Sequence, residues 1–165
     1  MVSVATDPLT PADRRWVADF FIEHWGATTM VVHGVSYEPH TLPGFVATAK
    51  GRRVGLITYR LGDDGCEIVS LDSTSPGRGV GTALVAAVVE EARRSRSARV
   101  WLVTTNDNLN ALRFYQKRGF ALVAVHRNAV AAARVLKPEI PLIGDDGIPI
   151  RDEIELELDL DGPDA

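Results

Sequence analysis

Three glycines at alternate positions are the residues of this sequence best suited to binding chemistry. Residues 76–84 read Pro-Gly-Arg-Gly-Val-Gly-Thr-Ala-Leu and lie between a predicted strand and a predicted helix. Glycine allows a sharp turn, and a helix start presents backbone N–H groups at the positive end of the helix dipole. This combination favours an anion, and a pyrophosphate fits it well. The alternative, a tight turn with no ligand, needs one glycine rather than three.

Two common phosphate-binding loops fit this segment badly. A Walker A loop needs Gly-Lys-Ser/Thr, and no lysine occurs in residues 77–84, so this loop is excluded. A dinucleotide fingerprint needs GxGxxG and an acidic residue about twenty positions later. Here Gly81 is followed by Thr82, and the next predicted strand ends in two threonines. A nucleotide-binding α/β domain therefore stays only as an alternative.

A second pattern lies in residues 108–120, where Asn108, Ala111 and Tyr115 precede Gln-Lys-Arg and then Gly-Phe. With the glycine loop, the sequence resembles the GNAT acetyltransferase superfamily. In that family the loop reads Gln/Arg-x-x-Gly-x-Gly/Ala, and the second motif reads Asn-x-x-Ala-x-x-x-Tyr. The resemblance covers about residues 44–125 and the final predicted strand.

The resemblance implies acetyl-CoA as co-substrate, with its pyrophosphate at the glycine loop and its pantetheine arm along the open edge of the preceding strand. The residues assigned to the cofactor in this way are Leu71, Asp72, Ser73, Gly77, Arg78, Gly79, Val80, Gly81, Thr82 and Asn108. One position departs from the family, because Pro76 stands where Gln or Arg is usual. We expect Arg78 to supply the charge instead.

Two residues are implied to transfer protons. Tyr115 resembles the general acid that protonates the departing CoA thiolate. Glu67, followed by Ile-Val, resembles the glutamate of the histone-acetylating branch that takes a proton from the amine through water. Each has a structural alternative: an aromatic packed in the core for Tyr115, and an outward-facing acid on an exposed strand for Glu67. The surrounding motif favours the catalytic role for Tyr115, and both interpretations of Glu67 stay open.

Metal and thiol chemistry have little support. Cys66 is the single cysteine, and its place beside Gly65 at a strand start is typical of a small buried hydrophobe. The four histidines show neither HExxH spacing nor another metal-ligand motif. We predict no metal site.

The hydrophobic pattern predicts the elements that position these residues. Strands are expected at 44–50, 53–61, 66–73, 99–105, 120–125 and 154–160, an extended segment at 28–37, helices at 13–25, 80–92, 108–118 and 129–136, and a loop at 138–149. Alternation of strands and helices from 66 to 125 implies parallel pairing. With the resemblance, this predicts one α/β domain over 1–165, a GNAT-like mixed sheet of six or seven strands with a V-shaped opening at the central strands, flanked by helices.

Composition narrows the partners and the location. The chain has 18 Lys+Arg against 22 Asp+Glu, a net charge of −4, and its basic residues are mostly scattered, which argues against nucleic acid. No apolar run is long enough for a membrane helix, and Asp7 and Pro8 stand where a secretory signal needs an apolar core. We expect a cytoplasmic protein, with a possible homodimer through the alternating final strand.

The sequence thus predicts an N-acetyltransferase that moves an acetyl group from acetyl-CoA to an amine by direct attack in a ternary complex. The acceptor is either a small molecule or a protein. Two further alternatives are a catalytically silent acyl-CoA-binding sensor module and a transferase that uses a longer acyl-CoA.

Overall fold

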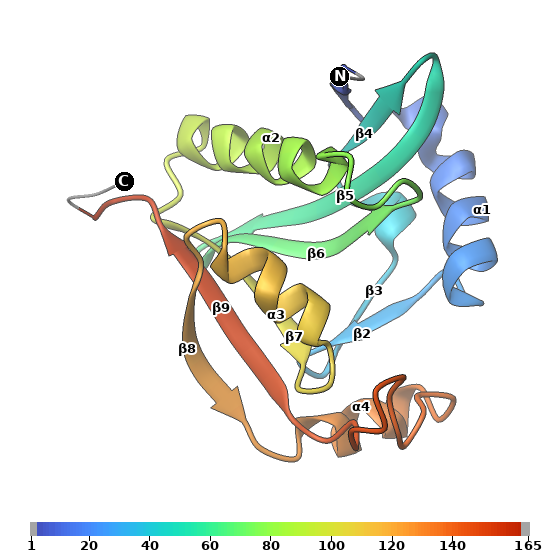
Figure 1. Cartoon of the computed structure of the whole chain (residues 1–165), viewed down its shortest axis with the longest axis vertical. Coiled ribbons are helices and arrows are strands. Elements are labelled where there is room, and N and C mark those ends of the chain that lie inside the picture. The colour runs from blue at the N-terminus through green and yellow to red at the C-terminus, as the bar shows by residue number, and fades with distance from the viewer. Residues whose placement is uncertain (1–2, 163–165) are drawn as a thin grey trace.

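A seven-stranded sheet forms the centre of the computed structural model, which describes residues 3–162 (Figure 1). The strand order is β1-β4-β5-β6-β7-β9-β8, and β2 and β3 form a separate pair. The strands are β1 (Ala5–Pro8), β2 (Met30–Val32), β3 (Val35–Tyr37), β4 (Gly44–Ala49), β5 (Arg52–Gly62), β6 (Gly65–Ser73), β7 (Arg99–Thr105), β8 (Ala121–His126) and β9 (Glu153–Asp159). The predicted mixed sheet with flanking helices is confirmed.

The first half of the sheet is an antiparallel meander of β1, β4, β5 and β6. The short turn between β4 and β5 is made by Lys50 and Gly51, both with positive φ, which is typical of a two-residue hairpin turn. Cys66 at the start of β6 is fully buried, and burial raises the pKa of its thiol to about 12. A thiol that stays protonated suits packing rather than nucleophilic attack.

The sheet opens between β6 and β7. These strands are parallel but pair at only two positions, Cys66 with Val100 and Glu67 with Trp101. Past this point the two halves of the sheet diverge: in Figure 1 β6 runs toward the right of the view, and β7 runs downward behind α3. A register shift against β5 leaves Val69 as an extra residue in β6, and such a bulge bends a strand. The V-shaped opening therefore begins directly after Glu67.

The second half of the sheet differs from the prediction. β9 lies between β7 and β8 and is antiparallel to both, so β6–β7 is the one parallel pair among the described residues. The parallel pairing expected from 66 to 125 therefore ends at β7, because the long connection after β8 allows the last strand to return into the gap. Pairing of two copies through β9 is excluded, because β9 already has a neighbour on each side. A homodimer through another surface stays a prediction.

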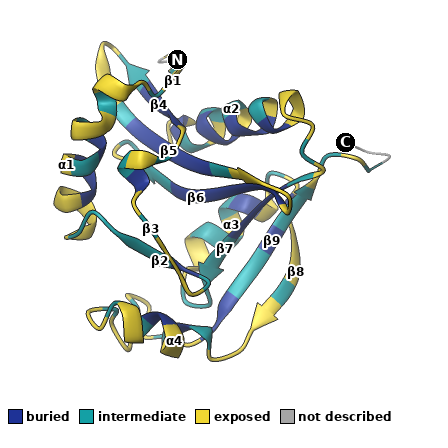
Figure 2. Cartoon of the chain, turned by 180° about the vertical axis from the view of Figure 1, so that it is seen from behind, coloured by how far each residue is buried: buried dark blue, intermediate teal, exposed yellow. Residues whose placement is uncertain are grey.

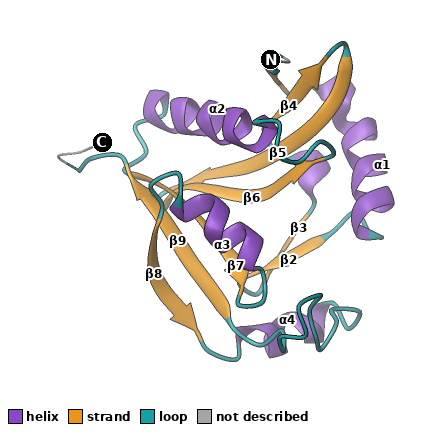
Figure 3. Cartoon of the chain, viewed as in Figure 1, coloured by secondary structure: helices purple, strands orange, loops and turns teal. Residues whose placement is uncertain are grey.

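Helices cover both faces of the sheet (Figure 2). The helical elements are η1 (Pro11–Asp13), α1 (Arg14–Trp25), η2 (Pro39–Thr41), α2 (Val80–Arg94), α3 (Leu109–Gln116) and α4 (Ala129–Leu136). Successive residues of β5 point to opposite faces: Ile57 packs in the core under α2, and Leu56 packs with Phe21 of α1. Figure 3 shows α2 along one half of the opened sheet and α3 along the other. Among the described residues, no helix has the length and apolar character needed to cross a membrane.

The segment predicted as one extended stretch at 28–37 is a hairpin, β2–β3. Its turn is formed by His33 and Gly34, both in the left-handed region. The sequence pattern missed this turn because His33 is a non-glycine residue with φ 41°, which is uncommon. The edge strand β1 was also not predicted.

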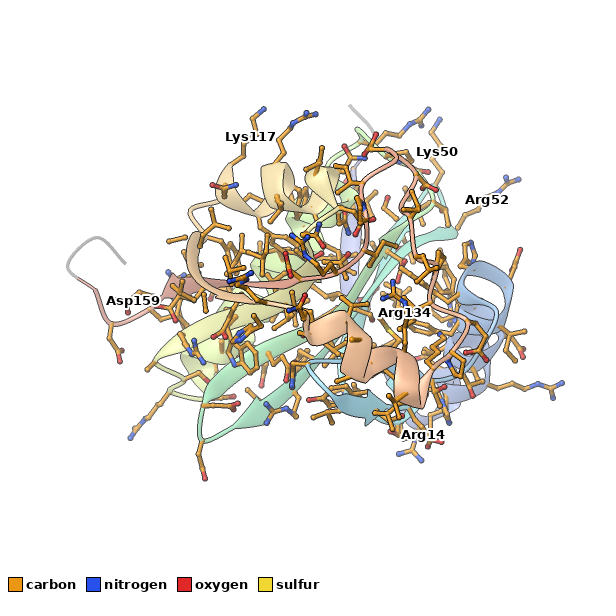
Figure 4. The ribbon with its side chains drawn as sticks, turned by 90° about the horizontal axis from the view of Figure 1, so that it is seen from below. Arg14, Lys50, Arg52, Lys117, Arg134 and Asp159 are labelled. Atoms are coloured by element: carbon orange, nitrogen blue, oxygen red, sulfur yellow. The ribbon has the colours of Figure 1, made fainter. Side chains whose placement is uncertain are left out.

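The connection between β8 and β9 is held by side chains that bond to its backbone. Arg134 of α4 donates to the carbonyls of Ile140, Pro141 and Ile150, and Asn106 accepts from the N–H groups of the two residues before β9. In Figure 4 Arg134 lies over the body of the molecule, whereas Arg14 and Lys117 reach out from its surface. The long loop therefore has a fixed path beside α4.

Replacing Arg134 with Met should release this loop without unfolding the sheet, because the three carbonyls lose their shared donor. Leu142 and Ile143, which are exposed in the loop, should then be cleaved by thermolysin at least several times faster than in the wild type. The exposed Arg14→Met is the matched control and should leave the cleavage rate unchanged. Equal cleavage in all three proteins would show that Arg134 does not order the loop.

Candidate active site

The glycine loop opens toward the sheet at the start of α2. Gly77 and Gly79 have φ of 78° and 77°, a conformation that favours glycine, and nothing lies within 4 Å of a Cβ built on either. The first N–H bonded within α2 is that of Ala83, which donates to Gly79. The N–H groups of the three residues before it are therefore free for an anion. A Cβ at Gly81 would lie 3.0 Å from the Phe114 ring, so this glycine allows α3 to approach α2 closely.

A cavity of about 610 Å³ joins this loop to the opening between β6 and β7. Most residues predicted to bind the cofactor line it: Leu71, Ser73, Gly77, Gly79, Val80, Gly81, Thr82 and Asn108. Trp25 and Met30 line it as well, although they come from α1 and β2. Because α1 and α2 cover opposite faces of the sheet, the cavity reaches from one face to the other through the opening.

Tyr115 lies in the wall of this cavity, on α3. Its ring is buried and packs edge-on against Phe114 and Phe120, with centroid distances of 5.0 and 5.2 Å. Burial is the main cause that raises the pKa of Tyr115, and the charge of Asp72 raises it further. The phenol is therefore protonated near neutral pH, as a proton donor must be. Asn108 caps α3 by accepting from the N–H of Ala111, which explains its place in the motif.

Comparison with known proteins decides the family. The model of the acetyltransferase (GNAT) family matches residues 12–120. The chain belongs to the GNAT acetyltransferase family. It is 46% identical over 142 residues to the uncharacterized protein YdhI of Bacillus subtilis (strain 168), covering 86% of this chain and 89% of YdhI.

Solved structures of acetyltransferases share the fold. A putative streptothricin acetyltransferase from Bacillus anthracis, crystallised with acetyl coenzyme A, aligns with a TM-score of 0.69 at 18% identity over 97% of this chain and 99% of that one. A Bacillus subtilis acetyltransferase in complex with CoA gives a TM-score of 0.66 at 20% identity, with the same coverage. The opened mixed sheet is thus the GNAT fold.

Two predicted cofactor residues do not line the main GNAT cavity. Arg78 lies instead in a separate hollow of about 400 Å³ with Lys50 and Arg52. Asp72 points to the α1 face, because it pairs with Leu56 of β5, and its Oδ1 accepts a hydrogen bond from the indole N–H of Trp25 at 3.0 Å. The binding role of both side chains stays a prediction.

Arg118 is a cavity residue that the sequence interpretation did not select. It donates to Thr82 Oγ1 at 3.1 Å, bonds to the Phe114 carbonyl and lies 3.6 Å from the centroid of the Phe114 ring. No carboxylate within residues 3–162 pairs with it. Pro76 has no charge, and Arg118 brings a positive charge to the start of α2 through its bond with Thr82. The only sequence signal was the basic pair before Gly119.

Glu67 is not exposed, as one interpretation had it, but fully buried. Its oxygens accept hydrogen bonds from Tyr37 at 3.1 Å and Arg60 at 3.0 Å, and its Oε1 lies 2.6 Å from His33 Nε2. Glu67 does not line the cavity that contains Tyr115. The structure therefore does not bring the two predicted catalytic residues, Tyr115 and Glu67, together at one cavity. The role of Glu67 as general base stays a prediction.

His33 connects the β2–β3 hairpin to the start of the opening. The hydrogen bond with Glu67 is the main cause that raises the pKa of His33 above its ordinary value of 6.5, and the charge of Glu153 adds to it. A raised folded-state pKa means that the contact stabilises the protein fully below about pH 6.5. This stabilisation is lost as the pH rises through the folded-state pKa of His33.

The melting temperature should therefore fall between pH 6 and pH 9 more steeply in the wild type than in His33→Asn, which cannot carry the charge. His126→Asn removes a half-exposed histidine and should keep the wild-type slope. Thermal unfolding by circular dichroism across this range measures the difference. Parallel curves for the wild type and His33→Asn would rule out a charged His33–Glu67 contact.

Proposed function

We propose that this protein is an N-acetyltransferase that transfers the acetyl group of acetyl-CoA to an amine by direct attack in a ternary complex. The observation that carries the proposal is the cavity, which starts at the free N–H groups of a helix N-terminus and passes through an opened sheet. Acetyl-CoA is the co-substrate of this family. Its pyrophosphate would lie on the N–H groups at the start of α2, beside Arg118.

The pantetheine arm would follow the edge of β6 beyond Glu67, where no β7 residue pairs with it. An extended ligand can add to such an edge through backbone hydrogen bonds. In this arrangement the thioester would lie near Tyr115, which lines the same cavity as the glycine loop. Free backbone N–H groups of the bent strand would stabilise the oxyanion that forms during attack.

A thiol-release assay with acetyl-CoA and a panel of primary amines tests this function. We expect CoA release that depends on the amine, together with the mass of the acetylated amine. Tight CoA binding without turnover on any amine would instead favour the acyl-CoA-binding sensor. Faster turnover with a longer acyl-CoA would favour the transferase for longer acyl groups.

Gly79→Glu should weaken CoA binding by about 100-fold or more, because a carboxylate would repel the pyrophosphate at the helix start. Isothermal titration calorimetry measures the affinity. Gly147→Glu is the matched control, since Gly147 also has a positive φ and open space around it but lies in the loop beyond α4. Equal affinity of folded Gly79→Glu and wild type would move the pyrophosphate site elsewhere.

Tyr115→Phe should lower kcat by about 10- to 1000-fold, because the thiolate loses its proton donor, while CoA affinity changes little. Tyr59→Phe removes the hydroxyl of another buried tyrosine, which packs on Phe45 outside the cavity, and should keep the wild-type kcat. Single-turnover kinetics with a verified acceptor measure the step. An unchanged kcat in Tyr115→Phe would exclude this hydroxyl as the acid.

A further inference from the structure

Asp72 carries a carboxylate oxygen that no contact in the described structure explains. Oδ1 accepts from Trp25, but Oδ2 is buried and has no hydrogen-bond partner in residues 3–162. Such an oxygen costs free energy unless a ligand or a proton satisfies it. Asp72 stands between Leu71 and Ser73, which both line the cavity, and its partner Trp25 lines it too.

The geometry points to Asp72 as the base that receives the acceptor's amino group, at the α1 side of the opening. This inference rests on the proposed acetyl transfer. Trp25 and Met30 form the apolar wall on this side, so the acceptor it fits is a primary amine carried on an apolar group. The thioester would lie between Asp72 on this side and Tyr115 on the other.

The electrostatics agree with this placement. Burial is the main cause that raises the pKa of Asp72 to about 6, and the hydrogen bond from Trp25 and the charge of His24 act against it. The titratable groups that face Asp72 are His24 on α1 and Tyr115 on α3, while β5 presents the apolar Leu56. The charge of Asp72 thus acts on the Tyr115 hydroxyl. A carboxyl that ionises near pH 6 suits a general base at neutral pH.

The proton balance of the step is complete with these two residues. Asp72 takes one proton from the bound ammonium, whose own pKa is lowered by the apolar wall. The amine nitrogen then bonds to the carbonyl carbon, the carbon–sulfur bond breaks, and Tyr115 gives its proton to the sulfur. The surplus proton on the new amide nitrogen restores the tyrosine hydroxyl through water, and Asp72 releases its proton to solvent.

Glu67 and Asp72 compete for the role of base. The oxygens of Glu67 are held by Arg60, Tyr37 and His33. Neither carboxylate lines the cavity itself, but Asp72 stands between Leu71 and Ser73, which both do. A base must have a free lone pair within reach of the proton that it takes. Of the two carboxylates, Asp72 has the free oxygen beside the cavity wall.

The test combines kinetics with stability. With phenethylamine as acceptor, Asp72→Asn should lower kcat at pH 7 by about 100-fold or more and lose the acidic limb near pH 6. Glu67→Gln should keep that limb, and Asp63→Asn, in the exposed turn before β6, should behave as wild type. Trp25→Phe removes the hydrogen bond to Oδ1, so the limb should move to higher pH.

The stability readout needs no activity. A carboxyl with a raised folded-state pKa is destabilising once ionised, so stability falls as the pH rises from about 4 to about 6. Asp72→Asn should therefore melt about 2 °C or more above the wild type at pH 8, and this gain should shrink at pH 4.5. Asp63→Asn should show no such pH-dependent gain.

The outcomes separate the two proposals. If the wild type releases no thiol with any amine, the proposed acetyl transfer is wrong. If Asp72→Asn then also shows no gain in melting temperature at pH 8, Asp72 carries no buried charge, and the inference about Asp72 is wrong on its own evidence. If the wild type is active and Asp72→Asn keeps the acidic limb, Asp72 is not the base and the transferase stands. A preference for spermidine over phenethylamine and hexylamine would contradict the apolar acceptor.

Discussion

The short parallel contact between β6 and β7 is the constraint on which the rest of the structure depends. Two residue pairs join the halves of the sheet, and the strands diverge immediately afterwards. If pairing continued along both strands, the sheet would be closed and the cavity would not exist. If it did not form at all, the meander and the β7–β9–β8 unit would lose their common hydrogen-bonded edge.

Polar groups fix the point at which the sheet opens. Glu67 forms one of the two pairs, and its buried carboxylate draws together β5, β3 and the turn of the hairpin through Arg60, Tyr37 and His33. A buried charge with this many donors is costly to disturb. We infer a positioning role: Glu67 holds the β2–β3 hairpin against the closed end of the opening.

The sequence predicted the parts that local chemistry determines. The alternating glycines of residues 77–81 and the apolar periodicity that predicts the helix at 80–92 each act within a few residues, so their pattern is visible in the chain. The placement of β9 between β7 and β8 depends on contacts between distant segments, and no local period encodes it. The same holds for Trp25 and Asp72, which are 47 residues apart in the chain and share one hydrogen bond.

Hydrogen exchange of backbone amides, followed by mass spectrometry with and without acetyl-CoA, tests the opened strand most directly as the cofactor site. We predict slower exchange on binding in residues 68–73, where the pantetheine arm adds to the free edge of β6, and in residues 79–82 at the start of α2. Protection confined to residues 49–54, beside the hollow that contains Lys50 and Arg52, would contradict this account. Exchange in β6 that stays unchanged at saturating acetyl-CoA would contradict it equally.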